Sequence, residues 1–237
     1  MDTNKKILVS DYDQTFYLND IDIEKNKTVI NKFRKQGNIF IIATGRSYSD
    51  FYNKLNTYNF EYDYVIINHG ATILDKNDKI LDNFSINNEI IKNIEKDLQL
   101  NKSINTFCCS KLDSRVDFNH KDLTKIHATY NSKKEALSIN EIINNKYSNY
   151  VNSYYVTENS VEIISKETNK SNSINLLLEK LKLSKNSVYT IGDGYSDIEM
   201  IKNFNGYAMI NSVNELKQVA IKEYKSVSEL VEELMKN

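Results

Sequence analysis

The chain has 237 residues, with 31 Lys and Arg against 32 Asp and Glu, so its net charge at pH 7 is -1. A charge this small gives no long-range attraction to nucleic acid or to an anionic membrane, and we expect the protein to bind neither. No apolar run is long enough to cross a membrane, and the first six residues lack the apolar segment of a secretory signal, so we expect a cytoplasmic protein. The only cysteines, Cys108 and Cys109, are then packing residues in a reducing compartment.

In the first third of the chain, apolar runs alternate with helical patterns. We predict strands over residues 6–10, 38–43 and 64–67, separated by helices marked by Val29, Ile30 and Phe33 and by Phe51, Tyr52 and Leu55. Such alternation is typical of right-handed crossovers and of a parallel sheet that helices cover on both faces. The near-continuous apolar character of the strands agrees with burial on both faces.

The pattern changes over residues 80–165. It predicts a helix marked by Ile90, Ile91, Ile94 and Leu98, strands over 105–109, 113–118 and 125–130, a helix over 133–146, and strands over 150–156 and 161–165. Runs of strands bracketed by helices favour an α+β module inserted into the α/β core. We therefore predict a core made of residues 1–79 and 166–237, with the module between them.

In the last third the first pattern returns. A helical stripe of Ile174, Leu177, Leu178 and Leu181 precedes a predicted strand over 187–191, and Val227, Leu230, Val231 and Leu234 mark a terminal helix. The predicted fold class is therefore α/β, with a Rossmann-like parallel sheet and an inserted α+β module.

Asp11 and Asp13 directly follow the first predicted strand. Where the chain turns past the end of a strand, both carboxylates can face one small volume, and their repulsion is relieved by a cation, a shared proton or solvent. A hard divalent ion such as Mg²⁺ takes one or two protein carboxylates and leaves positions for water and a phosphate. The alternative, on these residues alone, is an acidic turn that caps a helix.

Thr44, Gly45 and Arg46 follow the second predicted strand. Because ligands gather at the carboxyl ends of parallel strands, Thr44 should lie near Asp11. The Thr44 hydroxyl and the Gly45 amide can donate to a phosphoryl oxygen, and Arg46 can meet a carboxylate or phosphate through two hydrogen bonds. By itself, this tripeptide could equally be a helix cap.

A third strand end carries Asp193 and Asp197 in a glycine-rich turn. Together with Asp11 and Asp13 they would form an oxygen-rich cation site, since the sheet topology brings these strand ends together. Lys170, at the start of the helix before this strand, could neutralise a phosphoryl oxygen or an aspartate there. Taken alone, Lys170 would be an ordinary surface lysine.

These residues resemble the motifs of the haloacid dehalogenase superfamily, and within it the Cof-type phosphatases with a type II, subclass B cap. The four motifs appear in order as Asp11-x-Asp13-x-Thr15, Thr44-Gly45-Arg46, Lys170, and Gly192-Asp193-Gly194-x-Ser196-Asp197. Two softer matches are Asn68-His69-Gly70-Ala71 and Ala208-Met209-Ile210-Asn211-Ser212. The sequence departs from the family at Ser196, where Asn is usual, and at His69 and Ile210, which replace glycines.

The resemblance implies a Mg²⁺-dependent phosphatase that hydrolyses small phosphate monoesters through an aspartyl-phosphate. Asp11 would be the nucleophile, and Asp13 would be the general acid and base. The resemblance assigns Mg²⁺ to Asp11, Asp193 and the backbone carbonyl of Asp13, and the phosphoryl oxygens to Thr44, Lys170, Ser196 and the amides of Tyr12, Asp13 and Gly45. Supporting or substrate-contacting roles would fall to Arg46, Asp197, Asn68 and Asn211.

Other readings stay open at this point. A phosphomutase would use the same Asp11 and Asp13 but return the phosphoryl group to the substrate, and the change at Ser196 would suit a phosphate-binding protein with impaired turnover. The resemblance implies sugar phosphates or related metabolites as substrates. His120 and His127 are more simply structural, whereas His69 follows a core strand and could contact a leaving group. The sequence does not indicate an oligomeric state.

Overall fold

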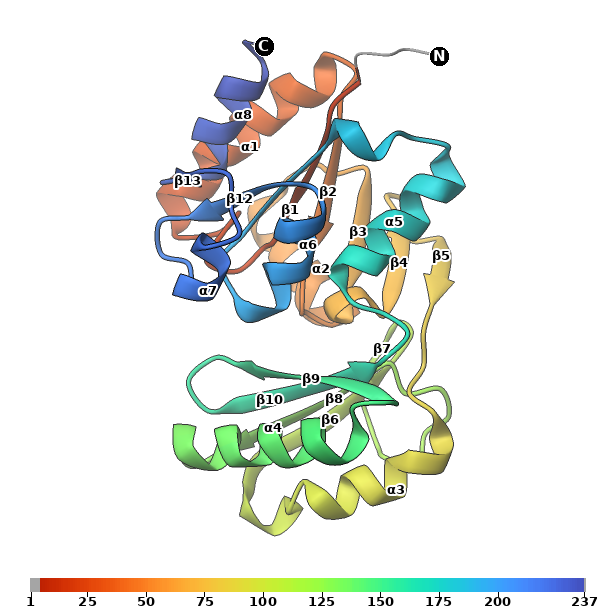
Figure 1. Cartoon of the computed structure of the whole chain (residues 1–237). Coiled ribbons are helices and arrows are strands. Elements are labelled where there is room, and N and C mark those ends of the chain that lie inside the picture. The colour runs from red at the N-terminus through yellow and green to blue at the C-terminus, as the bar shows by residue number, and fades with distance from the viewer. Residues whose placement is uncertain (1–4, 237) are drawn as a thin grey trace.

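The protein is described by a computed structural model that covers residues 5–236; residues 1–4 and 237, which belong to the two predicted core segments, lie outside the described residues. Two sheets organise the described part of the chain, one of eight strands and one of five. Figure 1 shows the larger sheet and its helices above the smaller sheet.

The larger sheet has the strand order β13-β12-β11-β1-β2-β3-β4-β5. Its strands are β1 (Ile7–Ser10), β2 (Ile39–Ala43), β3 (Tyr64–Ile67), β4 (Thr72–Asp75), β5 (Ile80–Asn83), β11 (Val188–Gly192), β12 (Asn205–Met209) and β13 (Glu223–Tyr224). Pairing is parallel from β13 to β3 and antiparallel from β3 to β5. The predicted α/β class is confirmed, and the antiparallel strands β4 and β5 are an addition that the sequence pattern did not predict.

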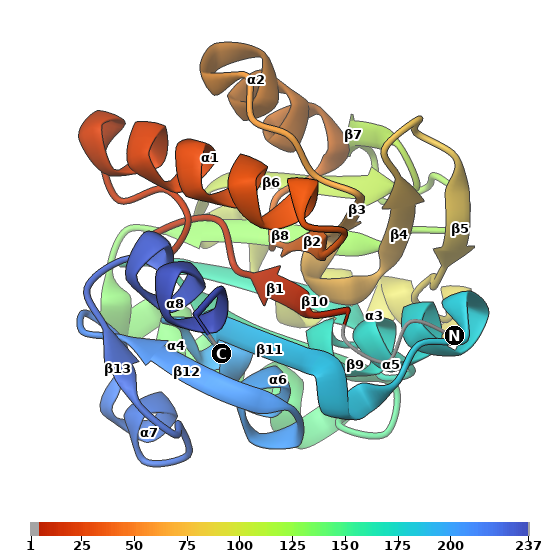
Figure 2. The same ribbon diagram turned by 90° about the horizontal axis from the view of Figure 1, so that it is seen from above.

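Helices cover both faces of this sheet (Figure 2). One face packs against α1 (Asp20–Lys35), α2 (Tyr48–Tyr58) and α8 (Val227–Leu234), and the other against α5 (Lys170–Leu181), α6 (Ile198–Asn203) and α7 (Asn214–Lys217). Successive side chains of a strand point to opposite faces of the sheet. Leu8 accordingly packs in the core beneath α1, α2 and α8, whereas Ile7 and Val9 pack in the core beneath α5, α6 and α7. A strand buried on both faces is expected to be mostly apolar, and β1 is apolar from Ile7 to Val9 before it ends in the buried Ser10.

The smaller sheet is antiparallel, with the order β7-β6-β8-β10-β9. Its strands are β6 (Ser103–Ser110), β7 (Asp113–Val116), β8 (Lys125–Tyr130), β9 (Val151–Val156) and β10 (Ser160–Ser165). Its helices, α3 (Asn88–Asp97) and α4 (Lys133–Tyr147), lie on the side away from the larger sheet (Figure 1). The other face of the smaller sheet is therefore turned toward the larger sheet.

The inserted module remains a proposal, with one change to its predicted start. Because β5 belongs to the larger sheet, we propose that the module begins after Asn83 rather than at residue 80. We keep the predicted end at residue 165, the last residue of β10.

Both segments that cross between the two sheets are fastened to one turn. The Phe84 amide donates to the Ala71 carbonyl at 2.7 Å, and the Thr168 hydroxyl donates to the Gly70 carbonyl at 2.9 Å. Gly70 has φ +114°, and a Cβ there would lie 2.5 Å from the backbone of Asn169, so only glycine fits. The crossing segments thus meet at Gly70 and Ala71.

Single-turn 3-10 helices complete the structure at η1 (Asn68–Gly70), η2 (Leu100–Lys102), η3 (Lys185–Ser187) and η4 (Tyr195–Asp197). Within residues 5–236, no helix combines the length and the apolar character needed to span a membrane. Cys108 and Cys109 are buried and unpaired in β6, as expected for packing residues.

Candidate active site

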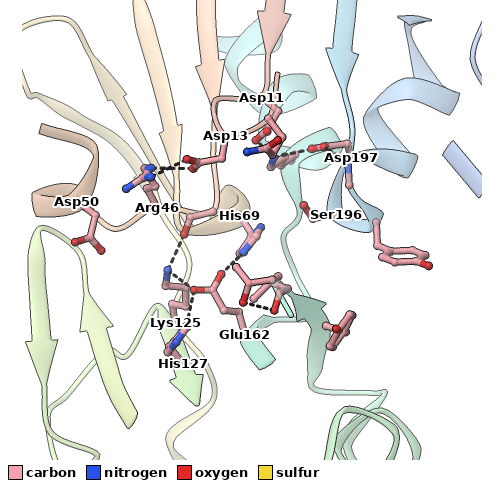
Figure 3. Close-up of a pocket in the computed structure, with 18 of the residues that line it drawn as sticks. Asp11, Asp13, Arg46, Asp50, His69, Lys125, His127, Glu162, Ser196 and Asp197 are labelled. Atoms are coloured by element: carbon pink, nitrogen blue, oxygen red, sulfur yellow. Dashed lines mark hydrogen bonds and ion pairs between the residues drawn. The ribbon is translucent and has the colours of Figure 1, made fainter. Parts of the chain in front are cut away.

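A cavity of about 780 Å³ lies between the two sheets. Asp11 and Asp13 line it from the larger sheet, and Lys125 and Glu162 line it from the smaller one (Figure 3). Asp193 also belongs to the lining. The cavity therefore stands at the carboxyl ends of the parallel strands, where open α/β sheets bind their ligands.

The position of β1 explains why the acidic residues converge. β1 is paired with β2 on one side and β11 on the other, and Ser10 is in register with both Ile42 and Ile191. The three strands therefore end at the same level, and the Asp11 amide donates to the Ile191 carbonyl at 3.0 Å. The predicted meeting of these strand ends is what the structure shows.

Asp11, Asp193 and Asp197 form an acidic cluster. Each offers a carboxylate oxygen, and these oxygens all lie within 4.8 Å of one another. The Thr15 hydroxyl donates to Asp193 Oδ1 at 2.6 Å, while burial and then the charge of Asp197 raise the pKa of Asp193 to about 6. Three hard oxygen donors that repel one another in this way fit a divalent cation.

Lys170 lies against the acidic cluster. It is the first residue of α5, whose N-cap Asn169 accepts a hydrogen bond from the Asn172 amide. The Lys170 side chain is almost fully buried, and Nζ donates at 2.6 Å to one oxygen each of Asp11 and Asp197. Burial alone would lower the pKa of Lys170, but these two carboxylates outweigh it and raise the pKa above its ordinary value. The two carboxylates therefore favour the charged form of Lys170, while burial raises the pKa of Asp11 well above its ordinary value.

The glycine-rich turn after β11 holds Asp197 in place. Its Oδ2 accepts from the amides of Asp193 at 3.1 Å and Gly194 at 3.0 Å. A Cβ on Gly192 would lie 2.7 Å from the Asp197 side chain, so the turn closes only with glycine there. Ser196 lines the cavity beside Asp197, and Tyr195 lies half-exposed at its rim.

Asp13 has a different environment from Asp11. Its carboxylate accepts two hydrogen bonds from the Arg46 guanidinium, at 2.8 and 2.7 Å, and is about half-exposed (Figure 3). The two-bond contact predicted for Arg46 is thus made to a carboxylate of this chain. Asp13 is not part of the acidic cluster, so the two aspartates of this motif have different surroundings and are suited to different chemical roles.

The loop after β2 brings Gly45 to the cavity but not the Thr44 side chain. Thr44 is fully buried, and its hydroxyl oxygen accepts from the Arg46 amide at 3.1 Å. A Cβ on Gly45 would lie 2.3 Å from the His69 ring, which is itself buried. Glycine therefore lets the imidazole pack on the loop backbone.

Three other predicted side chains lie outside the cavity lining. The Tyr12 ring is buried among Phe16, Phe51 and Phe60, although the role predicted for Tyr12 belongs to its amide. Asn68 is buried and donates to Thr124 at 3.4 Å, and the exposed Asn211 donates to the Gln14 carbonyl at 3.0 Å. Their roles stay predictions.

Sequence reasoning missed most of the wall that the smaller sheet contributes. Glu162 is buried and accepts a hydrogen bond from Lys125 Nζ at 2.8 Å. The Phe107 ring has Arg115 Cζ 3.7 Å from its centroid, and it stacks on the His127 ring with 4.5 Å between the two ring centroids. The signal for Glu162 was a charged residue inside the apolar strand Ser160–Ser165. His127 lines the cavity and has hydrogen-bond partners for both ring nitrogens, whereas His120 is exposed outside the lining; their structural roles stay predictions.

The family model of the haloacid dehalogenase-like hydrolases matches residues 8–119 and 105–230. A protein of Buchnera aphidicola subsp. Baizongia pistaciae, named "Putative phosphatase", is 29% identical over 90% of this chain and 89% of its own. An uncharacterized protein of Mycoplasma capricolum is 30% identical over 89% of this chain and 92% of its own.

The fold is similar to solved structures at low sequence identity. A haloacid dehalogenase-like hydrolase from Bacteroides thetaiotaomicron superposes with a TM-score of 0.78 at 19% identity, covering 97% of this chain and 99% of its own. A HAD/COF-like hydrolase from Plasmodium vivax, described there as putative, gives a TM-score of 0.85 at 18% identity, with 99% and 97% covered.

Proposed function

This chain belongs to the haloacid dehalogenase-like hydrolases, and on that premise we propose that it is a Mg²⁺-dependent phosphatase of small phosphate monoesters. The observation that carries the proposal is the position of Asp11, buried at the cavity within the acidic cluster and bonded to Lys170, with Asp13 held separately by Arg46. These different surroundings support attack by Asp11 and proton transfer by Asp13.

In the first step, an Asp11 oxygen forms a bond to phosphorus in line with the leaving oxygen, and the ester P–O bond breaks. Asp13 gives its proton to that leaving oxygen. In the second step, a water molecule attacks phosphorus and gives a proton to Asp13, while the bond between phosphorus and the Asp11 oxygen breaks. Inorganic phosphate and the free Asp11 carboxylate result, and the products are an alcohol and phosphate.

The anionic phosphoryl group must be held beside anionic carboxylates. Lys170 donates to Asp11 and lies within reach of a phosphoryl oxygen there, and the Gly45 amide is a further donor at the cavity, whereas the Thr44 hydroxyl is buried behind the lining. We propose that Asp11 and Asp193 hold Mg²⁺, with Asp197 as the third carboxylate of the cluster and the Asp13 carbonyl as the predicted backbone ligand. When bound, the ion would offset the repulsion between carboxylate and phosphate.

Arg46 sets the geometry of proton transfer. Its guanidinium holds both oxygens of Asp13, which keeps that carboxylate out of the acidic cluster. When Asp13 is protonated, one of its oxygens carries the hydrogen, and Arg46 keeps its bond to the oxygen without the hydrogen. The protonated oxygen is then free to face the leaving group.

The cavity volume of about 780 Å³ favours a small phosphorylated metabolite, such as a sugar phosphate, over a macromolecule. The parts of the leaving group that distinguish one metabolite from another would lie against the smaller sheet, near Phe107 and Arg115.

Hydrolysis of an aryl phosphate, measured as released phosphate with Mg²⁺ and with a chelator, tests the proposal. Asp11→Asn keeps the side-chain shape but removes the nucleophile, and we expect phosphate release to fall at least about a thousandfold. We expect chelation to abolish activity and added Mg²⁺ to restore it. Undiminished release by Asp11→Asn would refute the nucleophile, and no release from a broad panel of esters would refute the phosphatase.

A further inference from the structure

A second polar cluster lies where the two sheets face each other. Glu162 of β10 accepts from Lys125 Nζ at 2.8 Å and from His127 Nδ1 at 2.9 Å, and it also contacts His69 Nε2 (Figure 3). Lys125, His69 and Glu162 are 2%, 4% and 7% exposed. Burial alone would raise the pKa of Glu162, but Lys125 and the two histidines outweigh it and keep the pKa well below its ordinary value.

Lys125 also contacts a loop that belongs to the larger sheet. Besides Glu162, its Nζ donates to the Gly45 carbonyl at 2.6 Å (Figure 3). Lys125 belongs to β8 of the smaller sheet, whereas Gly45 belongs to the loop after β2 of the larger sheet. The contact therefore joins the inserted part of the chain to the backbone of the proposed phosphate-binding loop.

The peptide group between Gly45 and Arg46 carries this contact further. A trans peptide is planar, so fixing its carbonyl also fixes the direction of its N–H. That N–H, on Arg46, donates to Thr44 Oγ1 at 3.1 Å. A continuous chain of hydrogen bonds thus runs from Lys125 through the peptide to the buried Thr44 side chain, and it fixes the backbone of the loop where Gly45 lines the cavity. Bonds in such a chain polarise and strengthen one another.

The same loop is clamped from a second side. The His69 ring packs on Gly45 so closely that a Cβ there would lie 2.3 Å from it, and Glu162 contacts that ring. Glu162 therefore holds both groups that touch Gly45, the lysine and the imidazole. A buried ion pair of this kind is a weak source of stability because both charges lose their hydration, which makes a positioning role the better explanation.

We propose that Lys125 and Glu162 are positioning residues that complete the phosphate-binding loop from the opposite domain. The inference rests on the proposed function, since it deepens the account of the same site. The phosphoryl group would be gripped fully only when the smaller sheet is docked, whatever leaving group the substrate carries.

Binding of inorganic phosphate tests this directly because phosphate has no leaving group. We would measure its Kd by calorimetry with Mg²⁺ present in the wild type, Lys125→Met and Lys125→Arg. Loss of a charged hydrogen bond should weaken phosphate binding about tenfold or more in Lys125→Met, with partial recovery in Lys125→Arg. The matched control is Lys146→Met, because Lys146 is a half-exposed partner of Asp97; we expect it to bind phosphate as the wild type does.

Turnover separates this role from a contact to the leaving group. With two esters of one phosphate and different alcohols, Lys125→Met should lower kcat/KM by the same factor for both. An unchanged phosphate Kd, or a loss confined to one ester, would overturn the proposal. Since calorimetry needs no turnover, weakened phosphate binding in a chain that hydrolyses nothing would sustain this inference while refuting the phosphatase.

Removing both charges of the ion pair distinguishes a folding defect from a loss of loop support. Lys125→Met alone leaves Glu162 charged, whereas Lys125→Met with Glu162→Gln removes both charges and should fold at least as well as either single variant. If the loop has lost its support, the double variant still binds phosphate weakly. Recovery of normal phosphate binding in the folded double variant would overturn the proposal as well.

Discussion

Asp11 and Asp13 are separated by one residue and yet occupy opposite environments. Asp11 is buried and bonded to Lys170, whereas Asp13 is half-exposed and bonded to Arg46. A carboxylate fixed beside a lysine suits attack, and an accessible one suits exchange of a proton with the leaving group. The environment, rather than the residue type, divides the proposed chemistry.

Asp13→Asn should therefore affect esters unequally. We expect turnover of an alkyl phosphate to fall by about 10² to 10⁴, because the alkoxide must leave unprotonated. An aryl phosphate with an acidic phenol should still transfer its phosphoryl group to Asp11 and then stall, giving a burst of phenol close to the enzyme concentration. Rapid-mixing absorbance measures the burst.

Asp113→Asn, at an exposed position at the start of β7, is the matched control and should leave both esters unaffected. Equal losses on both esters by Asp13→Asn, without a burst, would contradict the proton-transfer role.

At the level of single residues, the sequence could predict the acidic cluster because its members follow apolar strands. Asp11 and Asp193 sit at strand ends that any parallel sheet brings together. Lys125 and Glu162 could not be placed in the same way. Their contacts with Gly45 and His69 depend on how the smaller sheet docks, and no local pattern encodes that approach.

Among the elements, the long helices and buried strands were predictable from their periodicity, as α5 and β11 show. The hairpin of β4 and β5 was not, because each of these short strands has only two apolar residues, and Ile80 is exposed. Short strands with little apolar alternation give no clear period of two.

The start of α5 matters beyond its own stability, because Lys170 is its first residue. Asn169→Ala removes the cap that accepts from the Asn172 amide, and we expect a loss of about 1 kcal/mol in the free energy of unfolding. Fraying of this turn also frees Lys170 from Asp11, so kcat should fall in the same variant.

Urea unfolding and kinetics measure both effects, and Asn169→Ser is the control because a serine hydroxyl can cap the helix. A stable, fully active Asn169→Ala would contradict the link between the cap and the lysine.

For the molecule as a whole, the acidic cluster should couple metal binding to stability and pH. Burial and Asp197 raise the pKa of Asp193 to about 6 from its ordinary 3.8. Between about pH 4 and pH 6, the metal-free folded protein therefore holds a proton on Asp193 that the unfolded chain has lost. This contribution to stability is full below about pH 4 and disappears as the pH rises through about 6. Mg²⁺ should then stabilise the protein more at pH 7.5 than at pH 5.

Melting temperatures with Mg²⁺ and with a chelator at the two pH values measure this coupling. Asp193→Asn removes the titrating group and a ligand, so its melting temperature should respond little to Mg²⁺ at either pH. A wild type that Mg²⁺ stabilises equally at both pH values would contradict the assignment of the metal to protonatable carboxylates.

The turn at Gly70 and Ala71 also has a mechanical consequence. Because both crossing segments are hydrogen-bonded to this turn, we expect it to be the hinge for any rotation of the smaller sheet. The hairpin between β9 and β10, which includes Thr157, lies at the end of that sheet away from the crossing segments (Figure 1). A small rotation about this turn would displace the hairpin more than any other part of the smaller sheet. The cavity would therefore open on the side of Thr157 and Tyr195.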